Sequence, residues 1–460
     1  MSSPEQCAAR LESLLGAERV QRSDEALVAC AVNGVFPGAL VRPSSAEEVV
    51  QLVRFAAEEK LELIAHGSRS KIDIGMPPAR YDIAVDMSGL HKIDHYDAND
   101  LTLSVDTGMP LRELAAHLAE HGQFLPLAVP CFETSTVGGA VASGIDSALR
   151  QQYGTARDFL IGAEFVDGKG NLCKSGGRVV KNVTGYDLHK LLIGSLGTLG
   201  TITRLNFRTF TLPEVSAGHL AIFKDVEAAI SYRVATENAG LPLANVELFS
   251  PEVAEILAAI LRREDATFPE ALAAGGWFVY AAFEGNSPVI NRISRDLERL
   301  ASESNAKSAD ILSNEENDSV GGMLREAFEW LRWASPAAVV YRFSILTWNP
   351  NQLRELLRLA ANKSLRCGIL LRAGGILYFA VFAEQENTVT LAELEALSTQ
   401  VFMFAADAQG YATVLHAPIS LKLQINVWGE TREDFPLMQK IKKAFDPNAV
   451  FACGRYVGGI

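Results

Sequence analysis

Apolar and polar positions in the first half of the chain follow helical spacing in some stretches and form short apolar runs in others. Two overlapping capping boxes, Ser44 with Glu47 and Ser45 with Glu48, precede apolar residues at helical spacing, and this predicts a helix that starts there. Short apolar runs bounded by turn residues predict strands. The further elements we expect are a helix at 110–120 and strands at 61–65, 82–86, 101–108, 160–166 and 201–207, with a hairpin turn at 167–170.

Beyond residue 217 helical runs alternate with longer apolar strands. We expect helices at 226–236 and 251–262, and a polar, acidic surface loop at 303–322. The strands followed by helices indicate an α+β arrangement with the helices on one face of a sheet. The change of pattern around 211–217 predicts a domain boundary. The strands expected in this part are 277–283, 339–346 and 376–382.

Two glycine-rich blocks indicate a ligand site. Residues 136–144 read Thr-Val-Gly-Gly-Ala-Val-Ala-Ser-Gly, and 194–200 read Gly-Ser-Leu-Gly-Thr-Leu-Gly. The second block follows a helical stretch at 186–193 and opens a strand, whereas a Rossmann fingerprint lies between a strand and the helix after it. Because glycine lets main-chain N–H groups approach a ligand, the two blocks predict a nucleotide cradle built from backbone.

Composition narrows the partners. The 460 residues include 42 Lys and Arg against 55 Asp and Glu, which gives a formal net charge of −13. Affinity for nucleic acid comes from clustered Lys and Arg, so nucleic acid is not expected as a partner. Because the net charge is negative, no overall positive field would attract an anionic cofactor, and such a cofactor must be held by local contacts. At 460 residues with 48% hydrophobic content, the chain exceeds what one core supports, and we expect two domains or more.

Cysteine usage and the N-terminus indicate the compartment. The six cysteines include no C-x-x-C pair, so we expect neither a local iron–sulfur motif nor a metal site, and a reducing cytoplasm fits. The N-terminus lacks the basic and apolar regions of a secretory signal. No run approaches 18 consecutive apolar residues, so we expect no helix that spans a membrane.

Several motifs, in order along the chain, carry a family resemblance. The run 181–188, Lys-Asn-Val-Thr-Gly-Tyr-Asp-Leu, is the most specific of them. The others lie at 42–48, in the loop ending Ser70-Lys71 with Gly75, and at 136–144, 153–158, 194–203, 445–448 and 454–455. In these residues the chain resembles the FAD-binding subunit of bacterial glycolate oxidase, within the vanillyl-alcohol-oxidase and p-cresol-methylhydroxylase superfamily of flavoproteins.

The resemblance implies an α+β fold. It has an FAD-binding domain of two α+β subdomains that clasp the cofactor, an α+β cap domain with an antiparallel sheet, and a C-terminal tail that returns to the FAD domain. The tail is too apolar for a free terminus, so we expect Phe451 and Tyr456 to be buried there. The expected boundaries are an N-terminal segment 1–40, the FAD-binding domain 41–214, the cap or substrate domain 215–430 and the returning segment 431–460.

The resemblance also implies which residues bind FAD. The loop 67–71 would contact the diphosphate, the block 136–144 would wrap the ribityl chain and flavin, and the backbone of Ile202 would pair with the far end of the cofactor. The family usually has glycine where Arg69 stands, so either Arg69 turns outward or its guanidinium replaces an amide contact with a phosphate. The residues assigned to the cofactor are Gly67, Ser68, Arg69, Ser70, Lys71, Thr136, Val137, Gly138, Gly139, Ser143, Gly144, Arg157, Gly197, Gly200 and Ile202.

The catalytic residues stay unknown at this stage. Oxidising a 2-hydroxy acid on a flavin needs a cation for the carboxylate and a base near the hydroxyl, commonly Arg and His. Arg342, Arg372 and His416 are weak candidates, and each could instead be structural. Arg157 could likewise form a surface pair with Asp158 instead of reaching the cofactor.

Two functions therefore stay open. The first is an FAD-dependent oxidoreductase acting on CH–OH groups, a subunit of a glycolate (2-hydroxy acid) oxidase complex that yields the 2-oxo acid. The second is an FAD-binding electron-transfer or assembly subunit with no substrate chemistry of its own. The resemblance implies a second flavoprotein subunit and an iron–sulfur subunit as partners, which would place this cytoplasmic chain at the periphery of the inner membrane.

Overall fold

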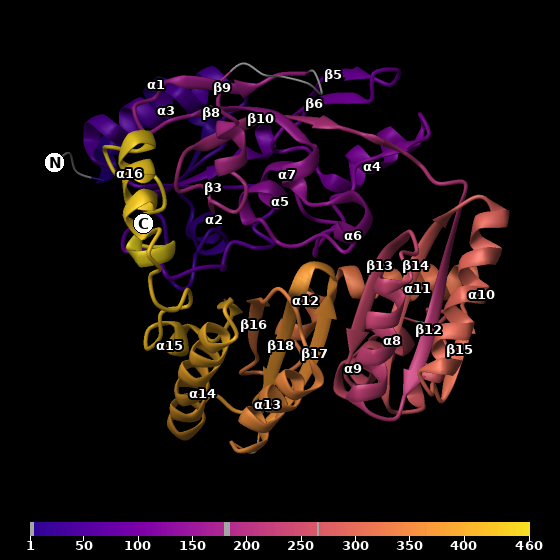
Figure 1. The fold of residues 1–460 in the computed structure, drawn as a ribbon. Helices are drawn as coiled ribbons and strands as arrows, with labels where there is room; N and C mark the ends of the chain where they lie inside the picture. Colours follow the sequence, from indigo (N-terminus) through magenta and orange to yellow (C-terminus); the bar gives the residue numbers. More distant parts are fainter. Residues whose placement is uncertain (1–3, 179–184, 265, 364) are drawn as a thin grey trace.

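The computed structural model describes residues 4–178, 185–264, 266–363 and 365–460, so part of the motif at 181–188 lies outside the described residues. Two small sheets, of four and five strands, form most of the upper half of the molecule in Figure 1, and one large sheet with its helices forms the lower half. The chain starts in the upper half, crosses into the lower half at β12, and ends back in the upper half.

The first small sheet has a parallel core. Its strand order is β1-β2-β4-β3, in which β2, β4 and β3 run in parallel and β1 joins antiparallel to β2. Ser45 caps α3 by accepting a hydrogen bond from the amide of Glu48 at 3.2 Å, as the capping pattern predicts. The element bounds are α1 Pro4–Leu15, β1 Val20–Gln21, α2 Asp24–Ala29, β2 Ala39–Val41, α3 Ala46–Glu59, β3 Leu63–His66 and β4 Ile83–Asp86.

The second small sheet is antiparallel, with the order β5-β6-β10-β8-β9. The hairpin predicted at 167–170 joins β8 to β9, and the stretch expected to be helical at 186–193 contains a short 3-10 turn, Leu188–Leu191. The element bounds are β5 Ile93–Asp97, β6 Thr102–Asp106, α4 Leu111–Ala119, β7 Gln123–Phe124, α5 Val137–Ser143, α6 Arg150–Tyr153, α7 Ala156–Phe159, β8 Leu160–Val166, β9 Leu172–Gly176, β10 Thr201–Arg208 and β11 Phe210–Thr211.

The large sheet is antiparallel throughout, as the resemblance implied, with the order β15-β12-β14-β13-β17-β18-β16-β19. Near-continuous burial along its central strands shows that both faces are covered. The strand bounds are β12 Val215–Phe223, β13 Leu243–Phe249, β14 Trp277–Gly285, β15 Ser308–Ile311, β16 Val339–Ser344, β17 Arg366–Arg372, β18 Ile376–Phe382 and β19 Tyr411–His416.

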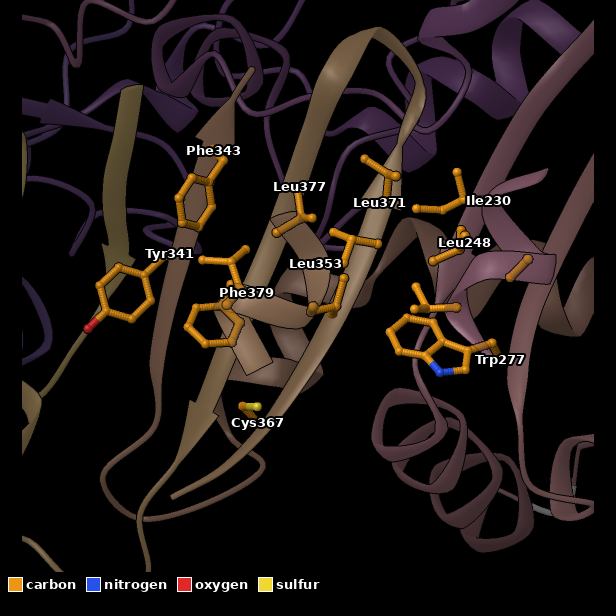
Figure 2. Close-up of a cluster of buried hydrophobic side chains, with 14 of the residues drawn as sticks. Ile230, Leu248, Trp277, Tyr341, Phe343, Leu353, Cys367, Leu371, Leu377 and Phe379 are labelled. Atoms are coloured by element: carbon orange, nitrogen blue, oxygen red, sulfur yellow. The ribbon is translucent and has the colours of Figure 1, made fainter. Parts of the chain in front are cut away.

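Helices cover both faces of this sheet, so the expectation of helices on one face is wrong. One face packs against α8, α10, α13 and α14, and Figure 2 shows the aromatic and aliphatic side chains of this core, among them Tyr341, Phe379 and Trp277. The other face packs against α9, α11 and α12. The helix bounds are α8 Val226–Asn238, α9 Pro251–Arg263, α10 Ser287–Glu303, α11 Asn314–Arg325, α12 Ala327–Arg332, α13 Pro350–Ala361, α14 Thr388–Asp407, α15 Ile419–Lys422 and α16 Phe435–Phe445.

The prediction of a surface loop at 303–322 is also wrong. This stretch contains β15, which pairs with β12 at the sheet edge, and most of α11. A capping box between Ser313 and Glu316 starts α11, and its apolar residues Val320 and Leu324 are fully buried. The acidic residues of the first turn favour a helix start, because they interact with the positive end of the helix dipole.

The C-terminal segment returns to the first small sheet, as the resemblance implied. The amide of Leu63 donates to the carbonyl of Val450 at 2.7 Å, and the amide of Ala452 donates back to Leu63 at 3.0 Å. Phe451 is 2% exposed and lies in the core of that sheet. Asp446 shapes the turn before it by accepting hydrogen bonds from the amides of Val450 and Phe451, both at 2.9 Å.

Among the residues that the structure describes, one helix, α14, is long and apolar enough to span a membrane by length and composition alone, with a mean hydropathy of 1.2. Its residues Leu394, Leu397 and Val401 are buried in the core of the large sheet. A core helix of a soluble protein passes the same test, so this helix is weak evidence for a membrane span.

Candidate active site

The segments predicted to form a nucleotide cradle line one cavity in the structure. The chain leaves β3 at His66 and turns through the loop 67–71, which faces α5 and the glycine block before β10. Together these segments line a cavity in the upper half of the molecule. The predicted cofactor residues that line it are Gly67, Ser68, Arg69, Ser70, Lys71, Thr136, Gly138, Gly139, Ser143, Gly197, Gly200 and Ile202.

The glycines leave room that side chains would fill. A Cβ placed on Gly197 meets nothing within 4 Å, and one placed on Gly139 meets only the hydroxyl of Thr136, at 3.1 Å. Gly138 instead packs against Thr107, whose Cβ would lie 2.5 Å from the added atom. Gly138 therefore serves close packing, whereas Gly139 and Gly197 keep the cavity open for a ligand.

Two cations line this cavity and are almost fully buried. Lys71 donates to the carbonyl of Pro130 at 2.8 Å, to Ser70 at 3.3 Å and to Ser135, and burial lowers its pKa to about 8. Arg455, from the C-terminal segment, reaches the same cavity and is 2% exposed. An anion bound here would offset the cost of burying these charges.

Arg69 occupies a backbone conformation that favours glycine, with φ of +64°. Its guanidinium lies 3.8 Å from the sulfur of Cys30, while the residue still lines the cavity. This backbone conformation explains why glycine is usual in the family where Arg69 stands. The side chain of Arg69 extends toward Cys30, at the C-terminal end of α2.

A second, larger cavity of about 1140 Å³ lies between the two halves of the molecule. Ser143 lines both cavities, so the larger one continues from the first. Gly144 and Gly194 form its wall on the small-sheet side, and a Cβ on Gly144 would lie 2.6 Å from the backbone of Gly194. The opposite wall comes from β16, β19, α14 and the segment 424–434.

Arg342 is the one candidate catalytic residue that lines the larger cavity. Its Nε donates to Asp146 at 2.5 Å, and Arg150 contacts the same carboxylate. On the neighbouring strand Tyr411 lies opposite Ser344 and lines the cavity beside Arg342. Burial alone would raise the pKa of Tyr411, but hydrogen bonds from Ser344 and Arg342 lower it overall. The Arg432 guanidinium lies 4.7 Å from the centre of the Tyr411 ring.

The remaining predicted residues line neither cavity. Arg372 is 1% exposed and donates to Glu247 at 2.7 Å, a buried ion pair inside the cap. His416 packs 5.8 Å from the ring of Trp333, and burial lowers its pKa to about 4. Val137 is buried in the core of the second small sheet. Arg157 is exposed.

Other lining residues were not found from the sequence. Met87 and Thr107 line the first cavity, and Tyr411, Trp428 and Arg432 line the second. They belong to no local motif, so sequence spacing gave no signal for them. Among the described residues, no group of three or more His, Cys, Asp or Glu side chains is arranged to hold a metal ion.

Comparison with known families agrees with this geometry. Residues 37–176 match a family described as an FAD binding domain, and residues 212–456 match the C-terminal domain of FAD linked oxidases. The chain belongs to the FAD-linked oxidase family. It is a flavoprotein oxidoreductase, and FAD is its cofactor.

Three relatives and one solved structure illustrate the similarity. Mitochondrial D-lactate dehydrogenase [cytochrome] of Arabidopsis thaliana is 26% identical over 92% of this chain and 74% of that protein. Glycolate oxidase subunit GlcD of Bacillus subtilis is 22% identical over 91% of this chain and 89% of that protein. Glycolate oxidase subunit GlcE of Escherichia coli is 34% identical over 37% of this chain and 48% of that protein. Substrate-bound p-cresol methylhydroxylase has the same fold, with a TM-score of 0.78, 18% identity and 98% and 96% coverage.

The residues present fit FAD. Two buried polar atoms of residues that line the first cavity have no hydrogen-bond partner in the described structure, His66 Nε2 and Arg455 Nε. His66 Nδ1 lies 2.9 Å from the carbonyl of Gly67 and therefore carries the proton, so Nε2 is an acceptor. The cradle thus offers a donor and an acceptor besides the backbone of its glycines. FAD bound here would be held by the loop 67–71, by α5 and by the glycine block before β10.

Proposed function

We propose that this FAD-linked oxidase oxidises a small 2-hydroxy acid to the 2-oxo acid. The observation that carries the proposal is the larger cavity, which joins the cofactor cradle at Ser143 and has Arg342, Tyr411 and Arg432 on its cap side. FAD supplies an acceptor for the two electrons of the oxidised C–H bond. The names of relatives, which include D-lactate and D-2-hydroxyglutarate dehydrogenases and glycolate oxidase subunits, support a 2-hydroxy acid substrate.

The cap residues suit recognition of a carboxylate. Arg342 is neutralised by Asp146 and therefore acts by holding its neighbours in place. The hydroxyl oxygen of Tyr411 accepts hydrogen bonds from Ser344 and Arg342, so its own proton remains free to be donated to a substrate oxygen. Arg432 is exposed beside Tyr411, forms a solvent-exposed ion pair with Asp434 at 3.7 Å, and carries a planar donor set that suits a carboxylate.

A second function is favoured by one observation. None of the described residues that line the larger cavity is a histidine, so no imidazole is present there to take the substrate hydroxyl proton. This favours an FAD-binding electron-transfer or assembly subunit. The similarity to GlcE, which covers 37% of this chain, is compatible with that role.

We also propose that the protein works in a complex with a second flavoprotein subunit and an iron–sulfur subunit. The relatives GlcD and GlcE are each named as a glycolate oxidase subunit, which supports an assembly. Electrons would leave the flavin through the iron–sulfur partner. The complex would be cytoplasmic and peripheral to the inner membrane.

Anaerobic reduction of the bound flavin separates the two functions. The purified holoprotein is mixed with glycolate, D-lactate or D-2-hydroxyglutarate, and the flavin absorbance is followed. Bleaching by one of them at a saturable rate establishes the oxidase function. A flavin that dithionite reduces but no hydroxy acid bleaches, with or without the partner subunits, rejects that function and leaves the electron-transfer role.

A further inference from the structure

A buried arginine on the C-terminal segment has more donors than protein partners. Nη2 of Arg455 donates to the carbonyl oxygens of Ile72 and Ile74, the latter at 2.9 Å. Nε is buried and has no hydrogen-bond partner in the described structure. A buried N–H without an acceptor costs free energy, so such a donor indicates a ligand that supplies one.

The charge of Arg455 is also uncompensated. No carboxylate among the described residues forms an ion pair with its guanidinium. Burial lowers the pKa of Arg455 to about 10, and the more distant Asp73 and Tyr81 offset only part of that effect. A fully buried cation without a counter-ion is expensive, and a bound anion would remove most of the cost.

Comparison with Lys71 shows which cation is available. Both side chains line the first cavity. The ammonium of Lys71 has three N–H groups, and Ser70, Pro130 and Ser135 already accept from it. Lys71 therefore braces the loop, whereas Arg455 still has an N–H to donate.

The position of Arg455 indicates the part of the cofactor it meets. Arg455 lines the first cavity, its neighbour Tyr456 lines the second, and Ser143 lines both. Arg455 therefore lies where the two cavities meet. The family resemblance assigns the loop 67–71 to the diphosphate, and Arg455 contacts the carbonyls of Ile72 and Ile74 directly after that loop, so its charge would lie beside the diphosphate.

We propose that Arg455 binds the diphosphate of FAD through Nε–H and that the cofactor thereby fastens the C-terminal segment. The carbonyl of Arg455 accepts from the amide of Met76 and from the indole of Trp428, both at 3.0 Å. One contact to the cofactor thus joins the loop after β3, the cap segment at Trp428 and the tail. The inference requires only FAD and is independent of the substrate proposed above.

Ligand affinity of the full-length apoprotein tests the contact. FAD and ADP share the diphosphate, so the dissociation constant of each is measured for the wild type, Arg455→Met, Arg455→Lys and Lys71→Met. We expect Arg455→Met to raise both constants by about 10- to 100-fold, the range for one charged hydrogen bond, and Arg455→Lys to raise them less. Lys71→Met is expected to lower the melting temperature of the apoprotein more than Arg455→Met does, and to change both constants less.

Hydrogen exchange of the segment 445–460 tests the fastening. FAD is expected to slow exchange there in the wild type and to have a much smaller effect in Arg455→Met at saturating FAD. The proposal is overturned if Arg455→Met binds FAD and ADP within threefold of the wild type. It is also overturned if that variant only melts lower without FAD while keeping the full FAD-dependent rise in melting temperature, because Arg455 would then be a structural anchor.

Discussion

Asp146 and Arg342 join the two halves of the molecule through a buried ion pair, with 2.5 Å between Oδ2 of the carboxylate and Nε of the guanidinium. Asp146 follows the glycine block 136–144, and Arg342 lies on β16 of the cap. The side chains are 6% and 16% exposed. The pair therefore fixes the cap over the cavity next to the flavin side of the cradle.

Asp146→Asn is expected to destabilise the fold by about 3 kcal/mol, because it leaves the buried guanidinium of Arg342 without its counter-ion. Chemical denaturation of wild type and variant measures the difference. Glu303→Gln is a matched control, since the Arg299–Glu303 pair is 55% and 58% exposed and is worth less than about 1 kcal/mol. Equal effects of the two substitutions would contradict a special role for Asp146.

The same ion pair predicts a pH dependence. Burial alone would raise the pKa of Asp146, but Arg342 and Arg150 outweigh burial and hold the pKa below its ordinary value of 3.8. The folded-state pKa is thus depressed, so the stabilisation is complete above about pH 4 and is lost as the pH falls below it. Denaturation curves between pH 3 and pH 6 are expected to show a steeper acid loss for the wild type than for Asp146→Asn.

Much of the fold could be predicted because local signals were strong. The capping pattern at Ser45 located α3, and the strands β8 and β18 have the bounds expected from their apolar runs. The miss at 303–322 had a physical cause, since polar and acidic composition concealed the Ser313 capping box and a short edge strand. The helices α8 and α9 were predicted, but their placement on opposite faces of the large sheet was not, because an antiparallel sheet can also leave one face open to water.

The candidate site was likewise predicted in one part and missed in another. The predicted cofactor residues lie in contiguous motifs, and twelve of them line the first cavity, whereas Met87, Thr107 and Arg455 also line it and were not assigned from the sequence. Tyr411, Arg432 and Arg342 come together only through the pairing of β16 with β19 and the return of the segment after β19. No spacing rule reports such contacts, and for that reason the larger cavity could not be predicted.

Gly139→Val is expected to give a folded protein that has lost most of its FAD. An added Cβ at Gly139 meets only the hydroxyl of Thr136, at 3.1 Å, so a small shift of that side chain admits it and the rest of the larger side chain occupies cofactor space. Gly138→Val is the matched comparison, because its Cβ would lie 2.5 Å from that of Thr107 and is expected to disrupt folding. The measurements are flavin content per chain and melting temperature. Full flavin occupancy in Gly139→Val would remove this residue from the binding surface.

Phe451→Ala is expected to destabilise the protein by about 3 to 5 kcal/mol, since it empties a site in the core beside β3. Leu437→Ala provides the control, because Leu437 is 60% exposed and should change stability by less than about 0.5 kcal/mol. Thermal unfolding of both variants checks the difference. A melting temperature of Phe451→Ala equal to that of Leu437→Ala would mean that the tail does not stabilise the first sheet.

Tyr411→Phe tests recognition of the substrate in the larger cavity. The variant removes the hydroxyl that Ser344 and Arg342 polarise, while the ring and its contact with Arg432 can remain. We expect flavin content and melting temperature to stay near those of the wild type, because the loss is one hydroxyl on a residue that is 38% exposed. The dissociation constant of oxalate, followed by the perturbation of flavin absorbance, is expected to rise about 10-fold, as is the KM of any hydroxy acid that reduces the flavin.

Thr399→Val, which also alters one hydroxyl on the cavity wall but lies on α14, should leave both constants within about twofold. Unchanged oxalate binding in Tyr411→Phe would place the carboxylate elsewhere in the cavity.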